Sequence, residues 1–330
     1  MSTTKYGDIS PRTAAYAAKE MLRRGTPYLV LEKFGQSKPL PKNKTDTVKF
    51  RRYEALDPSP NELEEGVTPT AKKLSKTDVT ATLTQFGDLI EITDYVKDTH
   101  EDDVLKESVE ILGEQQAQMI ETSRFDKLKA GTNVMYANGE DRSEVNEPIS
   151  LSLQRSVTRS LKRQNARHVT KILRSTPSYE TVNVAPAYIG LCHPDLEADI
   201  RGMDGFTPAE KYGQETPWEG EIGKVEDVRY IASTIFQPWE GEGNSTLNDM
   251  VSEDGDNVDV YPILYIARDA YGLVPLKGKG AVTPAVVNPD KPDKQDPLGQ
   301  RGYISWKTYN ATVILNDAWM VRAEVGATDL

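Results

Sequence analysis

The amino-acid sequence predicts a protein of the α+β class, and three observations support this prediction. A proline-free run from residue 101 to residue 136 repeats apolar side chains at the spacing of one long helix. Residues 47–53 and 76–96 alternate apolar and polar side chains, as extended strands do. From residue 149 onward, helical and strand-like segments are mixed and are separated by long loops. Helical and extended regions of this kind are typical of an α+β fold.

The composition limits the class of protein. Of the 330 residues 37% are apolar, and the mean hydropathy is −0.57. This apolar share favours an extended molecule with large contacts to its neighbours over a single sphere. The net charge of −11 argues against tight sequence-specific binding of nucleic acid, which needs a basic surface. No stretch approaches the roughly 18 apolar residues of a membrane span, and we expect neither a secretory signal nor a membrane partner.

Residues 1–44 are expected to form an N-terminal arm. Ser10 is a good cap for a short helix with Pro11 at its first position, and Gly25 would end that helix. A short apolar patch at residues 28–34 and a polar stretch follow. The arm has too few apolar residues to bury itself, so it must lie on the body, lie on another subunit, or stay disordered.

Residues 45–97 are expected to form an extended loop built as a two-stranded β-ribbon. The outgoing strand is 47–53 and the return strand is 76–96, in which Gly87 breaks the alternation as a bulge would. The connector between them is rich in Pro, Glu and Asp, which favour neither a helix nor a central strand. Because two strands alone bury too little apolar surface, the ribbon needs a partner surface.

The run from Glu101 to Tyr136 predicts a long helix that we call the spine. Its apolar residues recur at three- and four-residue steps, at Leu105, Val109, Leu112, Met119 and Ile120. Acidic residues stand at its start, and Lys127 and Gly131 stand near its end, as helix termini prefer. About 30 residues rising about 1.5 Å each give a rod of roughly 45 Å. An ordinary long core helix is the alternative interpretation.

The rest of the chain predicts a second helix and several strands. The helix spans residues 149–166 and has one apolar face, while its other face is basic. The basic side chains are Arg155, Arg159, Lys162, Arg163 and Arg167. They could contact phosphates of DNA or an acidic surface of a neighbouring subunit, or simply water. Strands are expected at 185–192, 225–231, 260–267, 303–313 and 319–325, and long loops at 241–259 and 281–300.

No catalytic constellation stands out, so we expect no enzyme. Cys192 adjoins His193, but neighbouring residues of a strand point to opposite faces and make poor partners as nucleophile and base. The chain has three histidines and lacks the HExxH, P-loop and GxSxG patterns. The single cysteine excludes an internal disulfide framework. We expect no cofactor.

One acidic loop is a weak candidate for a calcium site. Asp254, Asp256 and Asp259 cluster there with Asn257, and calcium prefers such oxygens. The twelve-residue spacing with a terminal glutamate is missing, so we expect a solvated loop and no metal.

Several long strings of residues resemble one family of tailed-phage major capsid proteins. They cover most of residues 45–240 and include TVKFRRYEAL, EGVTPTAKKLSKTDVTATLTQFGDLIEITDYVKDTHED, ILGEQQAQMIETSRFDKLKAGTNVMYANG, SLKRQNARHVTKIL, HPDLEADIR and GKVEDVRYI. The resemblance implies the HK97-like capsid fold. Its parts would be an N-terminal arm at 1–44, an extended β-ribbon loop at 45–97, a peripheral domain with the spine helix at 98–148, an axial domain with long loops at 149–300, and closing strands at 301–330 that return to the peripheral domain.

The same resemblance implies a function as a bacteriophage major capsid protein, a late structural protein of the virion. Such proteins self-assemble into hexamers and pentamers of an icosahedral shell around double-stranded DNA, which they contact without sequence preference. The implied location is the virion, with assembly in the host cytoplasm, and the implied partners are further copies, the portal protein, and scaffolding or decoration proteins. The intersubunit contacts expected on the extended loop are Lys49, Phe50, Arg51, Arg52, Tyr53, Glu64 and Glu65.

Two other functions are open to the sequence. A carboxylate-based hydrolase or lyase with a calcium site would be a compact monomer or dimer with a deep pocket. A non-capsid structural module of the virion, such as a tail component, would form fibres or small rings instead of closed shells.

Overall fold

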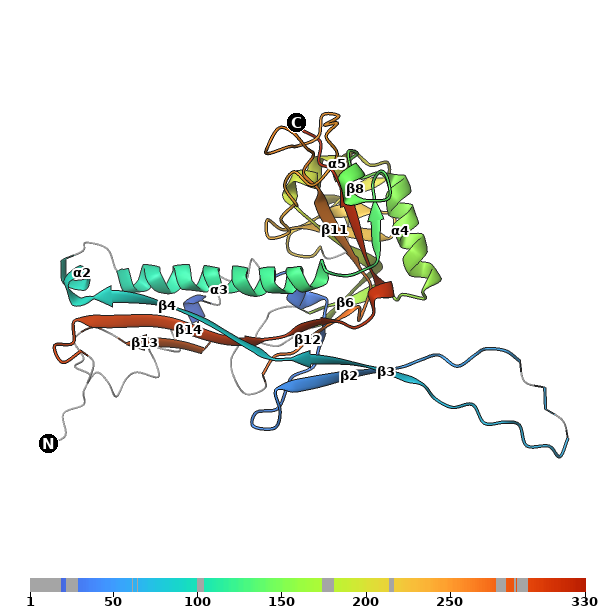
Figure 1. Ribbon diagram of the computed structural model, residues 1–330, viewed down its shortest axis with the longest axis horizontal. Coiled ribbons are helices and arrows are strands. Elements are labelled where there is room, and N and C mark those ends of the chain that lie inside the picture. Colours follow the sequence, from blue (N-terminus) through green and yellow to red (C-terminus); the bar gives the residue numbers. More distant parts are fainter. Residues whose placement is uncertain are drawn as a thin grey trace.

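The computed structural model has the mixed α+β architecture that the sequence predicts. It describes residues 19–21, 29–60, 62–63, 65–99, 104–173, 181–213, 217–276, 283–287, 289 and 296–330. Of the helix expected between Ser10 and Gly25, only residues 19–21 are described, and they are helical. A long lower body and an upper body meet near the end of the longest helix (Figure 1). The helices are α2 Asp94–Thr99, α3 Val104–Leu128, α4 Leu151–Arg163 and α5 Glu197–Gly202. Short 3-10 turns are η3 Leu31–Lys33, η4 Arg142–Glu144, η5 Pro194–Leu196, η6 Ala209–Lys211 and η7 Asp317–Trp319.

The lower body consists of α3 lying along a three-stranded antiparallel sheet (Figure 1). The order of this sheet is β13 (Thr283–Val287), β14 (Arg301–Asn310) and β4 (Thr84–Thr93). β14 pairs with β4 over its whole length, from Arg301 opposite Thr93 to Asn310 opposite Thr84. Leu112 of α3 shares one buried cluster with Ile92 of β4 and with Ile304 and Trp306 of β14. The helix therefore buries one side on this sheet.

The spine helix is shorter than the predicted run from 101 to 136. Residues 100–103 lie outside the described part, and α3 ends at Leu128, after which the Gly131 amide donates to the Leu128 carbonyl. The next residues form β5 (Val134–Tyr136), which pairs in parallel with β16 (Met320–Val325). Val and Tyr favour strands, and an available strand partner outweighs the local helical pattern.

The predicted ribbon is present at its base, but its return strand is split. β2 (Thr47–Tyr53) pairs with β3 (Lys76–Thr82) in an antiparallel register that places Phe50 opposite Val79. After Leu83 the chain continues as β4, which leaves β2 and pairs with β14. The described residues between 54 and 75 form no strand or helix, as expected, and the loop projects far from the body (Figure 1).

Gly87 does not mark the bulge that the sequence suggested. Its register opposite Lys307 is regular, and a Cβ at Gly87 would lie 2.7 Å from the Trp306 carbonyl oxygen. Glycine therefore permits a close approach between β4 and β14 instead of an extra residue.

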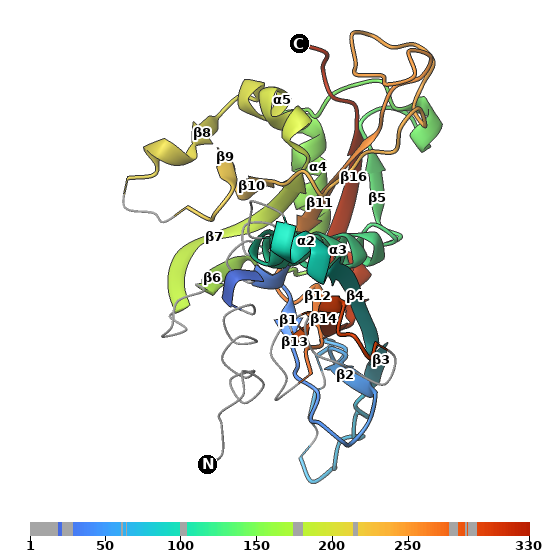
Figure 2. The same ribbon diagram turned by 90° about the vertical axis from the view of Figure 1, so that its left-hand side faces the viewer.

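The upper body is built on an eight-stranded mixed sheet, which spreads from β8 at one edge to β5 at the other (Figure 2). The strand order is β5, β16, β11, β7, β10, β9 and β8, with β6 paired to β7. Their bounds are β6 Val169–Leu173, β7 Thr181–Cys192, β8 Phe206–Pro208, β9 Glu221–Val225, β10 Val228–Ala232 and β11 Tyr261–Ile266. A smaller sheet of β1 (Gln36–Ser37), β12 (Tyr271–Leu273) and β15 (Thr312–Ile314) lies at the base of the ribbon.

The large sheet has a different core on each face. Side chains alternate along a strand, so Ile263 and Tyr265 of β11 lie on one face and Leu264 and Ile266 on the other. The first face packs against Val157 and Leu161 of α4, and the second packs against Phe125 and Leu128 at the end of α3. α4 begins at the Ser150 hydroxyl, which accepts from the Leu153 amide, as a helix cap does.

Three predicted segments of the later chain require correction. The strand expected at 225–231 is a hairpin of β9 and β10, which turns at Glu226 with a φ of 51°. The loop expected at 281–300 contains β13. This strand was not predicted, because the prolines of the segment disfavour a strand. The strand expected at 303–313 is divided at Ala311 into β14 and β15.

Strand pairing also divides the chain differently from the expected ranges 149–300 and 301–330. After β11 the chain leaves the large sheet, because β12 and β13 pair with β15 and β14 in the lower body. β16 then returns between β11 and β5 of the large sheet. Both the departure from the large sheet after β11 and the return at β16 depend on strand partners far away in the sequence. Local sequence patterns do not predict such pairings.

Candidate functional site

The base of the extended loop is held by an ion pair across the two strands. Arg51 and Asp78 are directly opposite each other, with Nε to Oδ1 at 2.8 Å and Nη2 to Oδ2 at 3.0 Å. The hydrogen bonds from Arg51 lower the pKa of the Asp78 carboxyl, and the same pair raises the pKa of Arg51. Both groups are close to solvent, so the pair fixes the register more than it adds stability.

Phe50 differs from the expectation of an intersubunit contact. Its side chain is buried within its own chain, in a cluster with Leu40, Val48, Ala81, Val274 and Ala311. Its ring lies so close to Gly272 that a Cβ there would be 2.8 Å from the ring. Phe50 therefore anchors the ribbon to the lower body. The alternation of the strand identified it as an inward residue but did not reveal what covers it.

Other predicted contacts on the loop are exposed. Lys49, Arg51, Arg52 and Glu65 are exposed, and Tyr53 exposes 62% of its surface. Glu64 lies outside the described residues. The described side chains of this set do not converge on one compact site, because they follow one another along an extended strand and its connector.

The sequence reasoning missed the apolar side chains of the connector. Leu56, Leu63, Val67 and Leu74 are all exposed, with Leu63 at 72%. The connector is not shapeless, since Ser75 and Thr77 donate to the Glu54 carboxylate and Lys72 donates to the Asp57 carbonyl at 2.8 Å. The sequence signal that could have identified them is the occurrence of single Leu and Val residues among the charged residues of the connector. Together these residues form a projecting surface that the rest of the described chain does not cover.

A second exposed apolar surface lies at the opposite end of the lower body. Leu89 of β4, Tyr95 and Val96 of α2, and Ile111 of α3 are exposed, with Tyr95 at 73%. Figure 1 shows α2 at one end and the extended loop at the other. An elongated molecule with apolar side chains at both ends is suited to contacts with neighbours at each end.

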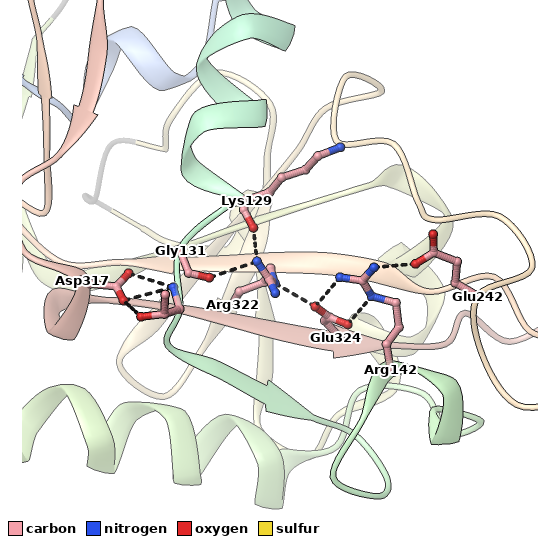
Figure 3. A network of polar contacts seen from close by, with 8 residues as sticks. Lys129, Gly131, Arg142, Glu242, Asp317, Arg322 and Glu324 are labelled. Atoms are coloured by element: carbon pink, nitrogen blue, oxygen red, sulfur yellow. Dashed lines mark hydrogen bonds and ion pairs between the residues drawn. The ribbon is translucent and has the colours of Figure 1, made fainter. Parts of the chain in front are cut away.

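A buried charge network joins the two bodies (Figure 3). The fully buried Glu324 of β16 accepts from Arg142 Nε at 2.7 Å and from Arg322 Nε at 2.8 Å. Arg322 also donates to the carbonyls of Lys129 and Gly131, just after α3. Bonds to Glu324 and Glu242 raise the pKa of Arg142. The network fixes the end of α3 to the large sheet, and nothing in the sequence pattern indicated it.

The basic side chains of α4 are exposed as predicted, but some have partners in the chain. Arg155 pairs with Glu226 at 2.6 Å, and Lys162 pairs with Asp227. These two acidic residues form the turn between β9 and β10. Arg159, Arg163 and Arg167 are exposed and make no ion pair within the described part of the chain. An open hollow of about 530 Å³ lies along this face and is lined by Arg155, Arg159, Lys162 and Arg163.

The acidic loop uses its carboxylates on its own backbone. Asp259 is buried and accepts from the amides of Gly241 and Glu253 at 2.8 and 3.0 Å. Asp254 accepts from the amides of Asp256 and Asn257, and these bonds lower its pKa. Among the described residues, no group of three or more His, Cys, Asp or Glu is placed to hold a metal ion. The geometry gives Asp254 and Asp259 a local structural role, whereas the side chain of Asp256, the third weak candidate, is exposed.

Cys192 and His193 do not form a nucleophile and base. The Cys192 thiol is fully buried and points to the Ile231 carbonyl at 3.6 Å, and burial raises its pKa. The His193 Nδ1 instead accepts from the Asp195 amide at 3.4 Å and caps the turn η5. A thiol with a raised pKa holds little thiolate at neutral pH and is a poor nucleophile.

None of the helices in the described residues is long and apolar enough to span a membrane.

The long helix over a β-layer, the projecting ribbon and the separate sheet body together define the HK97-like fold of viral capsid proteins. Solved structures with this arrangement include the capsid of Ralstonia phage GP4, with a TM-score of 0.67 and 14% identity over 89% of this chain and 87% of that chain. The capsid of cyanophage Pam1 has a TM-score of 0.63 and 12% identity over 92% of both chains.

The sequence comparisons give the family. A family model described as phage capsid protein matches residues 76–322, and the chain belongs to this family. A protein of Pseudomonas phage KPP21 named major capsid protein is 28% identical over 166 residues. This alignment covers 46% of the present chain and spans less than half, 42%, of that relative.

Proposed function

We propose that this chain is the major capsid protein of a tailed bacteriophage and that copies of it assemble into hexamers and pentamers of an icosahedral shell around double-stranded DNA. The observation that carries this proposal is the extended loop, whose apolar side chains project far from the body and have no cover. Apolar surface of this extent is typical of a protein that is completed by its neighbours. The family membership and the fold support the same assignment.

The extended loop supplies the main contact in this proposal. It lies across a neighbouring subunit and buries Leu56, Leu63, Val67 and Leu74. Burying each of these side chains fully would contribute at most roughly 1.5–3 kcal/mol. The exposed polar side chains Lys49, Arg51, Arg52, Tyr53 and Glu65 orient the contact, and we assign the same role to Glu64. Exposed ion pairs contribute less than about 1 kcal/mol each. Phe50 supports the loop from within its own subunit.

The parts of the chain take the following roles. Residues 1–44 serve as the arm, and 45–83 form the extended loop with its base. The spine helix, β4, β13 and β14 form the peripheral domain. The large sheet with α4 forms the axial domain, which therefore includes β5 and β16. This division follows strand pairing instead of continuous ranges.

The remaining parts of the proposal concern partners and location. The shell belongs to the virion and assembles in the host cytoplasm, with a portal protein at one vertex and with scaffolding or decoration proteins as assembly partners. Packaged DNA is contacted without sequence preference. We assign the chain a structural role and no catalytic activity, cofactor or metal, in keeping with its membership of a capsid protein family.

Assembly of the purified chain tests the proposal. Size-exclusion chromatography with light scattering, followed by electron microscopy, is expected to show capsomer-sized rings or closed shells. The double variant Leu63→Ser with Val67→Ser should assemble poorly while it melts at the same temperature, because both side chains are exposed within one subunit. The matched control is Lys73→Ser, which replaces an exposed charged side chain on the same loop. A chain that stays monomeric at high concentration under every assembly condition would refute the proposed function.

A further inference from the structure

Two segments of the sequence each carry charges of a single sign, and the two signs are opposite. Residues 148–179 contain no Asp or Glu, and their seven basic residues are Arg155, Arg159, Lys162, Arg163, Arg167, Lys171 and Arg174. Residues 233–259 contain no Lys or Arg, and their seven acidic residues are Glu240, Glu242, Asp249, Glu253, Asp254, Asp256 and Asp259. We call the exposed side chains of α4 and its C-terminal extension, Arg155 to Lys171, the basic face, and we call residues 240–259 the acidic loop.

The chain enters the acidic loop from the face of the large sheet opposite to α4, whereas Val251 within the loop packs against the cluster on the α4 face. α4 packs through Val157 and Leu161 on the face of β11 that carries Ile263 and Tyr265. Phe236, just before the acidic loop, belongs to the cluster on the other face, where its ring lies 5.1 Å from that of Phe125. Figure 1 shows α4 on one side of the upper body and the gold and orange loops on the other side and beyond its upper end.

Most of these charges have no partner within the described part of the chain. On the basic face, only Arg155 and Lys162 form ion pairs, whereas Arg159, Arg163, Arg167 and Lys171 are exposed and form none. In the acidic loop, Glu242 pairs with Arg142, whereas Glu240, Asp249, Glu253 and Asp256 are exposed and form no ion pair. Each surface therefore concentrates one sign of charge, which is unfavourable unless an opposite surface approaches it.

We propose that the basic face of one subunit docks on the acidic loop of a second copy of this chain, head to tail. Two different surfaces then meet at each contact, and repetition of such a contact closes a ring when the rotation allows it. The inference rests on the proposed function, and it names the surfaces that join neighbours within one ring. A DNA-binding role for the basic face would leave the acidic loop without a partner and must overcome the net charge of −11.

Reciprocal charge reversal tests this contact in the full-length chain. The basic-face variant is Arg159→Glu with Arg163→Glu, and the acidic-loop variant is Glu253→Lys with Asp256→Lys. Like charges then face each other across the contact, so each variant should need at least about tenfold more protein for half-maximal assembly. Combining all four substitutions restores opposite charges and should return assembly to within about threefold of the unmodified chain. Lys211→Glu, an exposed substitution elsewhere on the same body, is the control and should have no effect.

The controls separate this inference from the proposed function. Circular dichroism and melting should be unchanged in every variant, because all the substituted side chains are exposed. If the unmodified chain assembles and both reversal variants assemble equally well, the contact is refuted while the proposed function stands. If the basic-face variant assembles normally but retains less DNA, and the acidic-loop variant behaves like the unmodified chain, the basic face binds DNA and the inference is wrong. If the unmodified chain never assembles, the proposed function fails and the inference falls with it.

Cross-linking adds a readout of the geometry. Because Cys192 is fully buried, cysteines introduced at Arg159 and Asp256 are the reactive thiols of the folded chain. In assembled particles, the variant that carries both substitutions should give a ladder of covalent species larger than a dimer with a short bifunctional reagent. Each single variant should give none. Dimers from Arg159→Cys alone would show that α4 faces α4 and would overturn the head-to-tail arrangement.

Discussion

Replacing Glu324 by glutamine should destabilise the chain more than any exposed charge substitution. Glu324 is fully buried between Arg142 and Arg322, and its two oxygens accept three hydrogen bonds from their guanidinium groups. Breaking a buried ion pair typically costs 3–5 kcal/mol, because the partner charge stays buried without compensation. The Arg142 side chain is 27% exposed and that of Arg322 is 12% exposed, so part of this cost is relieved by water. We expect Glu324→Gln to lower the free energy of unfolding by about 2–4 kcal/mol.

Calorimetry under non-assembling conditions measures this effect. If the described bodies unfold together, a loss of this size lowers the melting temperature by about 3–6 °C for a chain of this length. Glu242→Gln is the matched control, since Glu242 also pairs with Arg142 but its side chain is 51% exposed, and its loss should cost less than about 1 kcal/mol. Equal effects of Glu324→Gln and Glu242→Gln would refute the reasoning that burial determines the strength of this network.

Three further predictions follow from single buried residues. Burial raises the pKa of Glu121 above its ordinary value near 4.5, so the native carboxyl binds a proton more tightly than the unfolded one does. The unmodified chain should therefore lose stability relative to Glu121→Gln as pH rises from about 4.5 through that raised pKa. Urea unfolding from pH 4 to pH 8 measures this, and a constant difference in unfolding free energy between the two proteins would contradict it. Phe50→Ala should lower the free energy of unfolding by roughly 3–5 kcal/mol, because it empties the cluster at the base of the ribbon. The exposed Tyr53→Ala should change it by less than about 0.5 kcal/mol, and comparable losses would argue against an internal role for Phe50. The Cys192 thiol should resist a thiol reagent in the folded protein and react once urea unfolds it; fast reaction in the native state would contradict its burial.

The elements that the sequence predicted well are those whose signal is local. The helical period placed α3 and α4, and the alternation of Thr47–Tyr53 placed β2 to the residue. The end of α3 was misplaced because β5 pairs with β16, which is almost 190 residues further along the chain. β4 was assigned to the ribbon for the same reason, since its partner β14 is more than 200 residues away.

The candidate surfaces divide in the same way. The basic face of α4 could be predicted because its side chains repeat at helical spacing on a helix with one apolar side. Glu324 could not, because a glutamate in an alternating strand is ordinarily assigned to the solvent side, and its burial depends on two arginines from elsewhere in the chain. The exposed leucines of the extended loop were overlooked because Pro and Glu dominate the composition around them.

The pairing of β4 with β14 has a consequence for synthesis on the ribosome. The strand at residues 84–93 emerges early, but its partner at 301–310 is made only when the chain is nearly complete. The buried cluster at the base of the ribbon also forms only late in synthesis, because it includes Val274 and Ala311. A half-made chain therefore lacks the platform from which its loop projects, and native contacts this distant in sequence form slowly. In the proposed shell, a nascent copy would therefore join only after its own translation has almost ended.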